Sequence, residues 1–425
     1  MSRPTALVTL TLLGFAACLG AALASQPRGG GGLAPAGGGG LPTPQGQEID
    51  KRAVAKLDVV RAPADLGDKA FAHATTLVGF GQRHPGTPGW SRQLDHIEST
   101  LQGLGLTVRR DTWTDRKERI TFTNLAATIP GKRPERIVLA CHHDTKCMQG
   151  HPDPAHNFHF VGANDGASGV ALLLALAPVL LATPREASIE LVFFDGEESL
   201  DWAWNDAARA LFGSKRFVQK HRDALLLGQE PRIVALLLLD MVGRADLHIQ
   251  DELYSTRELR QLMWSAAVAT GHQAAFCQRA EAASDDHKPF LDVGIPALDL
   301  IDLNGNPHWH KPTDTLENMA PRSLQIVADV VLTMLPAVER RSVRRADGPA
   351  AAVATAARPI APAGGRALSA APARRPAGRG RPCARARTPG RRSRSPPVRR
   401  CRCGRRVRRP RASGPSAARA AAPRR

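Results

Sequence analysis

Cysteine is scarce in the central part of this chain, and it does not occur in a pattern that would build a disulfide framework. Of the seven cysteines in 425 residues, four lie in the first 24 or the last 85 residues, which leaves Cys141, Cys147 and Cys277 between them. An odd number of cysteines without a recognisable spacing argues against a disulfide scaffold and against a cysteine-based metal site. Internal repeats are also absent, which excludes a fold built from repeated units.

Lysine is absent from the last 85 residues, and acidic side chains are reduced there to one, Asp347. This segment, residues 341–425, holds 25 arginines amid alanine, proline and glycine, and it lacks the apolar side chains that would offset the entropy cost of ordering. We therefore expect a disordered tail. The rest of the chain has 33 basic and 38 acidic residues, so the net charge of +19 belongs to the tail alone. A tail that binds an anionic polymer remains an alternative, but the body has the balance of a soluble enzyme and needs no nucleic acid.

Acidic residues are absent from the first 24 residues. Arg3 precedes an apolar run at residues 6–24 that ends in Ala22-Leu23-Ala24, the layout of a secretory signal peptide. We expect an extracytoplasmic, secreted protein; the run is also just long enough to remain as a membrane anchor. Residues 25–47 are a Gly/Pro-rich linker. One catalytic domain is therefore expected over residues 48–340, acting as a monomer.

The central region alternates between helical and strand patterns, which is typical of an α/β fold. Continuous apolar runs at residues 137–141, 189–194 and 233–239 predict central strands that are covered on both faces. Residues 166–181 predict a buried helix. Further helices are expected at residues 68–80, 90–104 and 321–335, and further strands at residues 107–112, 120–129 and 295–301. These patterns predict an α/β domain with a central mixed, largely parallel sheet flanked by helices.

Side chains with acid–base or metal-binding chemistry follow several of these apolar runs. The segments are Cys141-His142-His143-Asp144, Gly162-Ala163-Asn164-Asp165, Asp195-Gly196-Glu197-Glu198, Leu239-Asp240 and Trp309-His310. Because the carboxyl ends of parallel strands meet at one edge of a sheet, we expect these side chains to converge. Imidazole and carboxylate ligands suit zinc. Taken singly, Asp165 is as easily a helix cap and the glutamate pair a solvated turn; taken together, they predict a metalloenzyme.

The region 48–340 resembles the glutaminyl-peptide cyclotransferases (glutaminyl cyclases), a branch of the zinc exopeptidase clan. The stretches that carry the resemblance, in matching order and spacing, are residues 83–89 (RHPGTPG), 140–146 (ACHHDTK), 160–165 (FVGAND), 193–198 (FFDGEE), 212–214 (FGS), 285–290 (DDHKPF) and 309–310 (WH). The resemblance implies that Asp165, Glu198 and His310 are the ligands of one zinc ion, with a fourth position left for substrate or water.

The resemblance also implies roles for the neighbouring side chains. Glu197 would be the general base and acid, and Asp240 and Asp285 would be a carboxylate pair that hydrogen-bonds behind it. The implied substrate-binding residues are Trp309 and one or both of Trp202 and Trp204. The implied reaction converts the N-terminal glutamine of a peptide or protein into pyroglutamate and releases ammonia, with zinc polarising the γ-amide.

A dinuclear zinc aminopeptidase of the same clan is the alternative. Its five ligands would be His142, Asp165, Glu198, Asp240 and His310, and all of them are present. Asp285 favours the cyclotransferase, because two carboxylates that face each other stay together by sharing a proton. An Asp240 engaged in this way would be a poor ligand for a second metal. We therefore expect one zinc per chain, and two if the alternative holds.

Overall fold

The computed structural model describes residues 47–202, 204 and 206–346. The expected signal peptide or anchor at residues 1–24, nearly all of the linker and most of the tail lie outside the described residues. The boundaries proposed for these parts therefore stay predictions.

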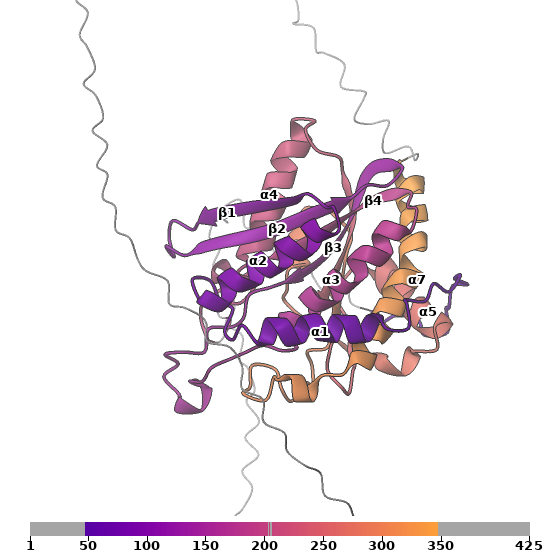
Figure 1. Ribbon diagram of the computed structural model, residues 1–425. Helices are drawn as coiled ribbons and strands as arrows, with labels where there is room; N and C mark the ends of the chain where they lie inside the picture. The colour runs from indigo at the N-terminus through magenta and orange to yellow at the C-terminus, as the bar shows by residue number, and fades with distance from the viewer. Residues whose placement is uncertain (1–46, 203, 205, 347–425) are drawn as a thin grey trace, which may run out of the picture. The chain divides into compact units, whose positions relative to one another are not determined.

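A mixed six-stranded sheet forms the centre of the domain (Figure 1), with the strand order β1-β2-β4-β3-β5-β8. Its strands are β1 (Val108–Thr114), β2 (Thr121–Ile129), β3 (Arg133–His142), β4 (Ala187–Phe194), β5 (Ile233–Asp240) and β8 (Ala297–Ile301). Strands β4, β3, β5 and β8 run parallel, whereas β2 is antiparallel to β4 and β1 to β2. A short second sheet pairs β6 (Ile249–Glu252) with β7 (Phe276–Glu281). The predicted mixed, largely parallel sheet is confirmed.

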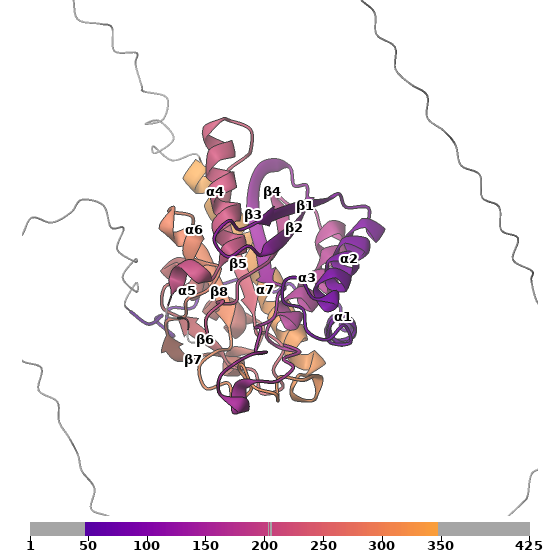
Figure 2. The ribbon, with the colours of Figure 1, turned by 90° about the vertical axis from the view of Figure 1, so that its left-hand side faces the viewer.

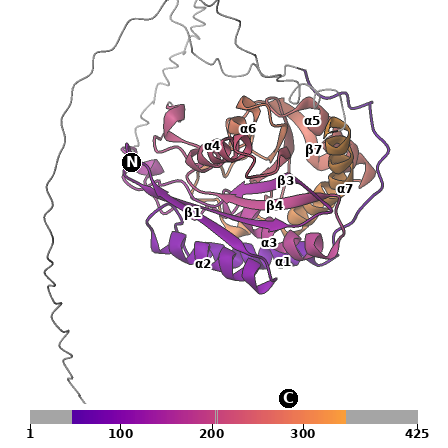
Figure 3. The ribbon, with the colours of Figure 1, turned by 90° about the horizontal axis from the view of Figure 1, so that it is seen from above.

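Helices cover both faces of the large sheet. They are α1 (Leu66–Val78), α2 (Pro88–Gly103), α3 (Ala167–Ala182), α4 (Phe212–Leu226), α5 (Arg257–Ala269), α6 (Lys288–Asp292) and α7 (Pro321–Ala346). Figures 2 and 3 show α1, α2 and α3 on one side of the sheet, with α4 and α6 on the other. The sequence did not predict α4, because the residues that it buries include Gly213, Ser214 and His221, so its inward face has little apolar periodicity.

The core brings the start of α3 against the ends of two central strands. A Cβ atom on Gly169, in the first turn of α3, would lie 2.3 Å from the carbonyl oxygen of Leu239 and 2.7 Å from Cβ of Cys141. Only glycine permits this approach. The helix therefore begins beside the carboxyl ends of β3 and β5, which places Asp165 at the edge of the sheet.

Helix α7 contains the stretch Pro321–Arg341, which is long and apolar enough to cross a membrane. However, 78% of its most apolar window is buried inside the domain. It lies against α1 and α5 and serves as a core helix of this fold.

Candidate active site

The predicted site residues come together at the carboxyl edge of the sheet, where they line one cavity of about 300 Å³. Its lining includes all nine of them: Asp165, Glu197, Glu198, Trp202, Trp204, Asp240, Asp285, Trp309 and His310. Met241, Ile301 and Leu303 add an apolar wall. Residues separated by up to 145 positions thus form one concave site, with carboxylates at its base and aromatic rings around them.

Asp165, Glu198 and His310 form a cluster with the chemistry of a metal site. Nε2 of His310 lies 3.3 Å from Oδ2 of Asp165 and 3.3 Å from Oε1 of Glu198. Oε2 of Glu198 is buried and has no hydrogen-bond partner. One donor atom from each residue lies within 4.8 Å of the other two. Two buried carboxylates and an imidazole with an unsatisfied oxygen fit a divalent cation such as zinc.

The pKa values of His310 and Asp165 reflect the charges of this cluster. Burial alone would lower the pKa of His310, but the charges and hydrogen bonds of Glu198 and Asp165 raise it to about 10. Burial would raise the pKa of Asp165, yet hydrogen bonds from His142 and His310 hold it well below its usual value. The carboxylates therefore favour a positive charge at this point.

His142, Asp165 and Asp240 form a second cluster that shares Asp165 with the first. Nε2 of His142 lies 3.0 Å from Oδ1 of Asp240 and 3.3 Å from Oδ1 of Asp165. Its Nδ1 lies 3.6 Å from Oδ1 of Asp144. The five groups named for the dinuclear alternative are thus arranged as two adjoining three-residue sets, so geometry leaves that alternative open.

The loop that carries Asp165 is held by two buried residues to which the sequence analysis gave no role. Asp314 accepts hydrogen bonds from the backbone N–H groups of Asn164 (2.7 Å) and Asp165 (3.0 Å). The guanidinium of Arg83, which is fully buried, donates to the carbonyl oxygens of Val161 and Gly162. Arg83 lies in RHPGTPG, one of the stretches that carry the family resemblance, and Asp314 follows His310 by four residues, and these positions were the available signal.

Glu197 lies beside the candidate metal-binding residues, in a group of buried carboxylates. Its backbone N–H donates to Asp144 at 3.1 Å, which fixes the turn after β4. Burial, together with the charges of Asp285 and Glu198, raises the pKa of the Glu197 carboxyl well above its usual value. Burial and the charge of Asp240 likewise raise the pKa of Asp285 to about 7. These groups can therefore hold protons near neutral pH.

Asp240 and Asp285 were expected to form a hydrogen-bonded pair. Among the described residues they interact through their charges, and no hydrogen bond joins them. Asp240 makes its hydrogen bond with His142, and Oδ1 of Asp285 accepts one from the backbone N–H of Asp286 at 2.5 Å. Oδ2 of Asp285 is buried without a hydrogen-bond partner. Asp285 thus occupies the predicted pocket but faces more than one carboxylate.

The three tryptophans line the cavity. Trp202 and Trp309 are 38% and 40% exposed, which is unusual for this residue and leaves their rings available to a ligand. The ring of Trp309 stacks on His310 at a centroid distance of 4.5 Å. Buried Lys146 donates to the carbonyl oxygens of Ser199 and Asp201 and lies 5.6 Å from the ring of Trp204. Both Trp202 and Trp204 line the cavity, so the structure does not separate them.

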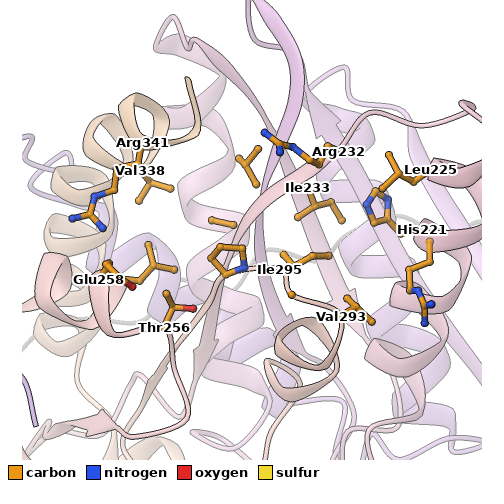
Figure 4. Close-up of a pocket in the computed structure, with 16 residues that line it drawn as sticks. His221, Leu225, Arg232, Ile233, Thr256, Glu258, Val293, Ile295, Val338 and Arg341 are labelled. Carbon is orange, nitrogen blue, oxygen red and sulfur yellow. The ribbon is translucent and has the colours of Figure 1, made fainter. Parts of the chain in front are cut away.

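A larger cavity, of about 490 Å³, lies at the amino ends of β5 and β8 (Figure 4). Its lining is mainly apolar, with Ile233, Ile295 and Val338, and it contains none of the predicted site residues. Its polar side chains are three arginines with His221, Thr256 and Glu258, and none of the candidate metal-binding groups among the described residues lies there. The smaller cavity therefore carries the chemistry, although it is not the most spacious one.

The chain is similar to known proteins in sequence and in fold. The profile of peptidase family M28 matches residues 124–335. Glutaminyl-peptide cyclotransferase of Drosophila melanogaster is 30% identical over 281 residues, which cover 59% of this chain and 75% of that protein. The crystal structure of an Acidobacteriales bacterium glutaminyl cyclase has 32% identity and a TM-score of 0.59, and covers 68% of this chain and 99% of that one. A leucine aminopeptidase precursor from Bacteroides thetaiotaomicron, 24% identical with a TM-score of 0.59 over 66% of this chain and 99% of that one, shares the fold.

The sheet, the carboxyl-edge site and the family match define the class as a zinc exopeptidase-like protein of peptidase family M28. Within that class, the chain belongs to the glutaminyl-peptide cyclotransferase (glutaminyl cyclase) family.

Proposed function

We propose that this protein is a zinc-dependent glutaminyl-peptide cyclotransferase, which converts the N-terminal glutamine of peptides or proteins into pyroglutamate and releases ammonia. The observation that carries the proposal is the single small cavity in which Glu197 adjoins the Asp165–Glu198–His310 cluster beneath Trp309. The relatives named above support the choice of reaction.

Asp165, Glu198 and His310 would hold the metal, and a zinc ion bound there would supply a Lewis acid for the γ-carbonyl of the substrate. The tryptophans of the lining would bind the first residue and exclude water. A cavity of this size accepts one side chain, so residues further along the peptide remain outside it.

Glu197 would move the proton. An N-terminal glutamine carries its nucleophile, the α-amine, and its electrophile, the γ-amide, on one residue, so the protein gains most by positioning the two. Glu197 accepts a proton from the attacking amine and returns it to the departing amide nitrogen, which leaves as ammonia. Its raised pKa suits a group that must both take up and release a proton near neutral pH. Asp240 and Asp285 would set the electrostatic environment of Glu197.

The dinuclear aminopeptidase is the second candidate, because the His142–Asp165–Asp240 cluster is complete. One experiment separates the two functions. The purified protein is incubated with a Gln-initiated and a Leu-initiated peptide, while released ammonia and leucine are measured and zinc is counted per chain. We expect ammonia and a pyroglutamyl product from the first peptide, no leucine from the second, and one zinc. Free leucine with two zincs would establish the aminopeptidase instead.

A further inference from the structure

The larger cavity at the amino ends of β5 and β8 takes no part in the proposed reaction. Its volume of about 490 Å³ falls within the range of ligand-binding sites. Ile233, the first residue of β5, lines it, whereas Asp240 at the other end of that strand lines the active-site cavity. Seven residue steps of roughly 3.3 Å separate these two residues, or about 23 Å. The larger cavity is therefore a separate site on the opposite edge of the sheet.

The interior of this cavity is apolar. Ile233 and Ala235 of β5, Leu259 of α5 and Val338 of α7 line it, and all four are buried. Ile295, in the loop before β8, adds a half-buried aliphatic side chain. These side chains offer no hydrogen bonds, so a ligand of this space has an apolar body.

Apolar side chains continue to the C-terminal end of α4. Leu225 lines the cavity and is 40% exposed, and Figure 4 shows it across the cavity from Val338. Leu226 and Leu227, which follow it in the chain, are 83% and 69% exposed. Exposed apolar surface of this kind is typical of interaction sites. The surroundings of the cavity therefore favour an apolar ligand as well.

Three arginines border the apolar interior: Arg222 of α4, Arg232 just before β5 and Arg341 of α7. All three are exposed, so they lie where the cavity opens to solvent. Within residues 47–202, 204 and 206–346, none of them forms a salt bridge or donates a side-chain hydrogen bond. The charge of Arg232 does act on Glu135, but Glu135 pairs with Arg133. The three guanidinium groups are therefore available to an anion.

The other polar groups of the lining leave it positive. Glu258 is its one carboxylate and lies in the first turn of α5, where the helix dipole stabilises a negative charge. Thr256, the N-cap of the same helix, also lines the cavity, so the positive end of that dipole lies there too. Burial lowers the pKa of His221, which is therefore neutral. Three arginines against one glutamate suit a ligand with a negative group.

We propose that this cavity is a binding site for an amphipathic anion of the fatty-acid class, with the acyl chain in the apolar interior and the carboxylate at the arginines. Burial of the chain supplies most of the affinity, because exposed ion pairs contribute little. The arginines supply the preference for a negative head group, since a guanidinium group pairs well with a carboxylate. The inference is independent of the proposed cyclotransferase reaction.

Titration calorimetry of the full chain with hexanoate, octanoate and decanoate tests the apolar interior. Each added methylene that enters the cavity should tighten binding about three- to fourfold, so decanoate should bind about 100-fold more tightly than hexanoate. Decyltrimethylammonium has the same chain and the opposite charge, and it should bind at least about tenfold more weakly than decanoate. An affinity that does not depend on chain length would overturn the inference, because the arginine-rich segment 341–425 could bind any carboxylate.

Substitutions in the lining test where the ligand binds. Val293 is a half-buried lining residue, and Val293→Trp fills the space that the acyl chain needs. The affinity for decanoate should fall at least about tenfold in this variant. The double variant Arg222→Gln/Arg232→Gln should weaken decanoate binding about fivefold and leave the binding of 1-octanol, a neutral amphiphile, unchanged.

Arg116→Gln is the matched control. Arg116 is exposed between β1 and β2, lies outside the cavity and forms no salt bridge with a described residue, so its variant should bind decanoate like the parent. Thermal unfolding shows whether each variant is folded. If Val293→Trp fails to fold, the chain-length series and the arginine variant still decide the question.

Two outcomes would assign this surface differently. Decanoate binding of parental strength in both the Val293 and the arginine variants would place the anion elsewhere and overturn the inference. Sedimentation of the protein with vesicles of phosphatidylcholine and phosphatidylglycerol, without any binding of free decanoate, would also overturn it. The exposed leucines and arginines would then serve a membrane surface.

Discussion

Nε2 of His142 lies 3.0 Å from Oδ1 of Asp240, and this contact links Asp240 to the candidate metal-binding residues. The same nitrogen lies 3.3 Å from Asp165. Burial would lower the pKa of His142, but the charge of Asp240 and the acceptor oxygens of Asp144 and Asp165 raise it well above its usual value. A proton on Nε2 of His142 and a cation bound by His142, Asp165 and Asp240 exclude each other, because both need the same nitrogen lone pair. Protonation of His142 therefore competes with the binding of a second metal ion.

The Asp285→Ser variant tests whether the chain binds one zinc ion or two. The raised pKa of Asp285 shows that it competes with Asp240 for charge, and serine removes the competitor. We expect cyclisation to weaken by at least about tenfold and the zinc content to rise from one toward two per chain. Zinc is counted by elemental analysis beside the rate of ammonia release. Unchanged activity with one zinc would remove Asp285 as the feature that separates the two functions.

Glu197 and Glu198 are adjacent in sequence but should respond differently to the same change. Glu197→Gln should retain zinc and lose turnover by about 10²- to 10⁴-fold, because the amide cannot carry the proton. Glu198→Gln should lose zinc, since the carboxylate with the unsatisfied oxygen is then gone. The paired measurement of bound metal and kcat checks both. Loss of zinc in the Glu197 variant would show that the two roles are exchanged.

Removal of a ring from the cavity lining should affect binding more than turnover. Trp309→Ala is expected to raise KM about tenfold, which corresponds to the apolar contact that a large side chain loses, with a smaller change in kcat. Parallel Trp202→Ala and Trp204→Ala variants show which of those two rings contacts substrate. Trp113→Ala is the control, because Trp113 lies in β1 beside Phe122 and Arg216, outside the cavity. An equal KM in all four would contradict the assignment.

Acid should destabilise the folded protein through His73 in α1 and His96 in α2, whose ring nitrogens lie 3.2 Å apart. Burial, then the charge of His96, lowers the pKa of His73 to about 4. The unfolded chain therefore binds more protons than the folded chain between about pH 6.5 and about pH 4, so stability is present above this window and is lost as pH falls through it.

His73→Gln should make the melting temperature less sensitive to acid. Because His73 is only half-buried, solvent screening reduces its share to about 1 kcal/mol. Thermal unfolding at about pH 7 and about pH 5 measures the difference. The exposed His159 offers a control substitution, His159→Gln, with no such effect expected. A parental acid sensitivity in the His73 variant would show that other groups control it.

Hydrophobic patterning accounts for most of what could be predicted. The runs that form β3, β4 and β5 are buried along nearly their whole length. Their sequences are therefore apolar on both faces, and the strands could be recognised from the sequence. Helix α4 was missed because its inward side carries glycine, serine and histidine. The short elements β6, β7 and α6 are held by tertiary contacts, since four to six residues contain too little periodicity to mark them.

The sequence by itself determined the α/β class, the identity of the polar groups after each strand and the family whose pattern they follow. It could do so because strand burial and strand-end chemistry are local properties. Only the tertiary structure decided that Asp165, Glu198 and His310 lie within 4.8 Å of one another, and that His142 and Asp240 complete a second set. It alone revealed that Asp285, His287 and Asp299 also lie within 4.8 Å of one another. Their partners lie on separate strands, and the distances between side chains depend on how those strands are ordered in the sheet.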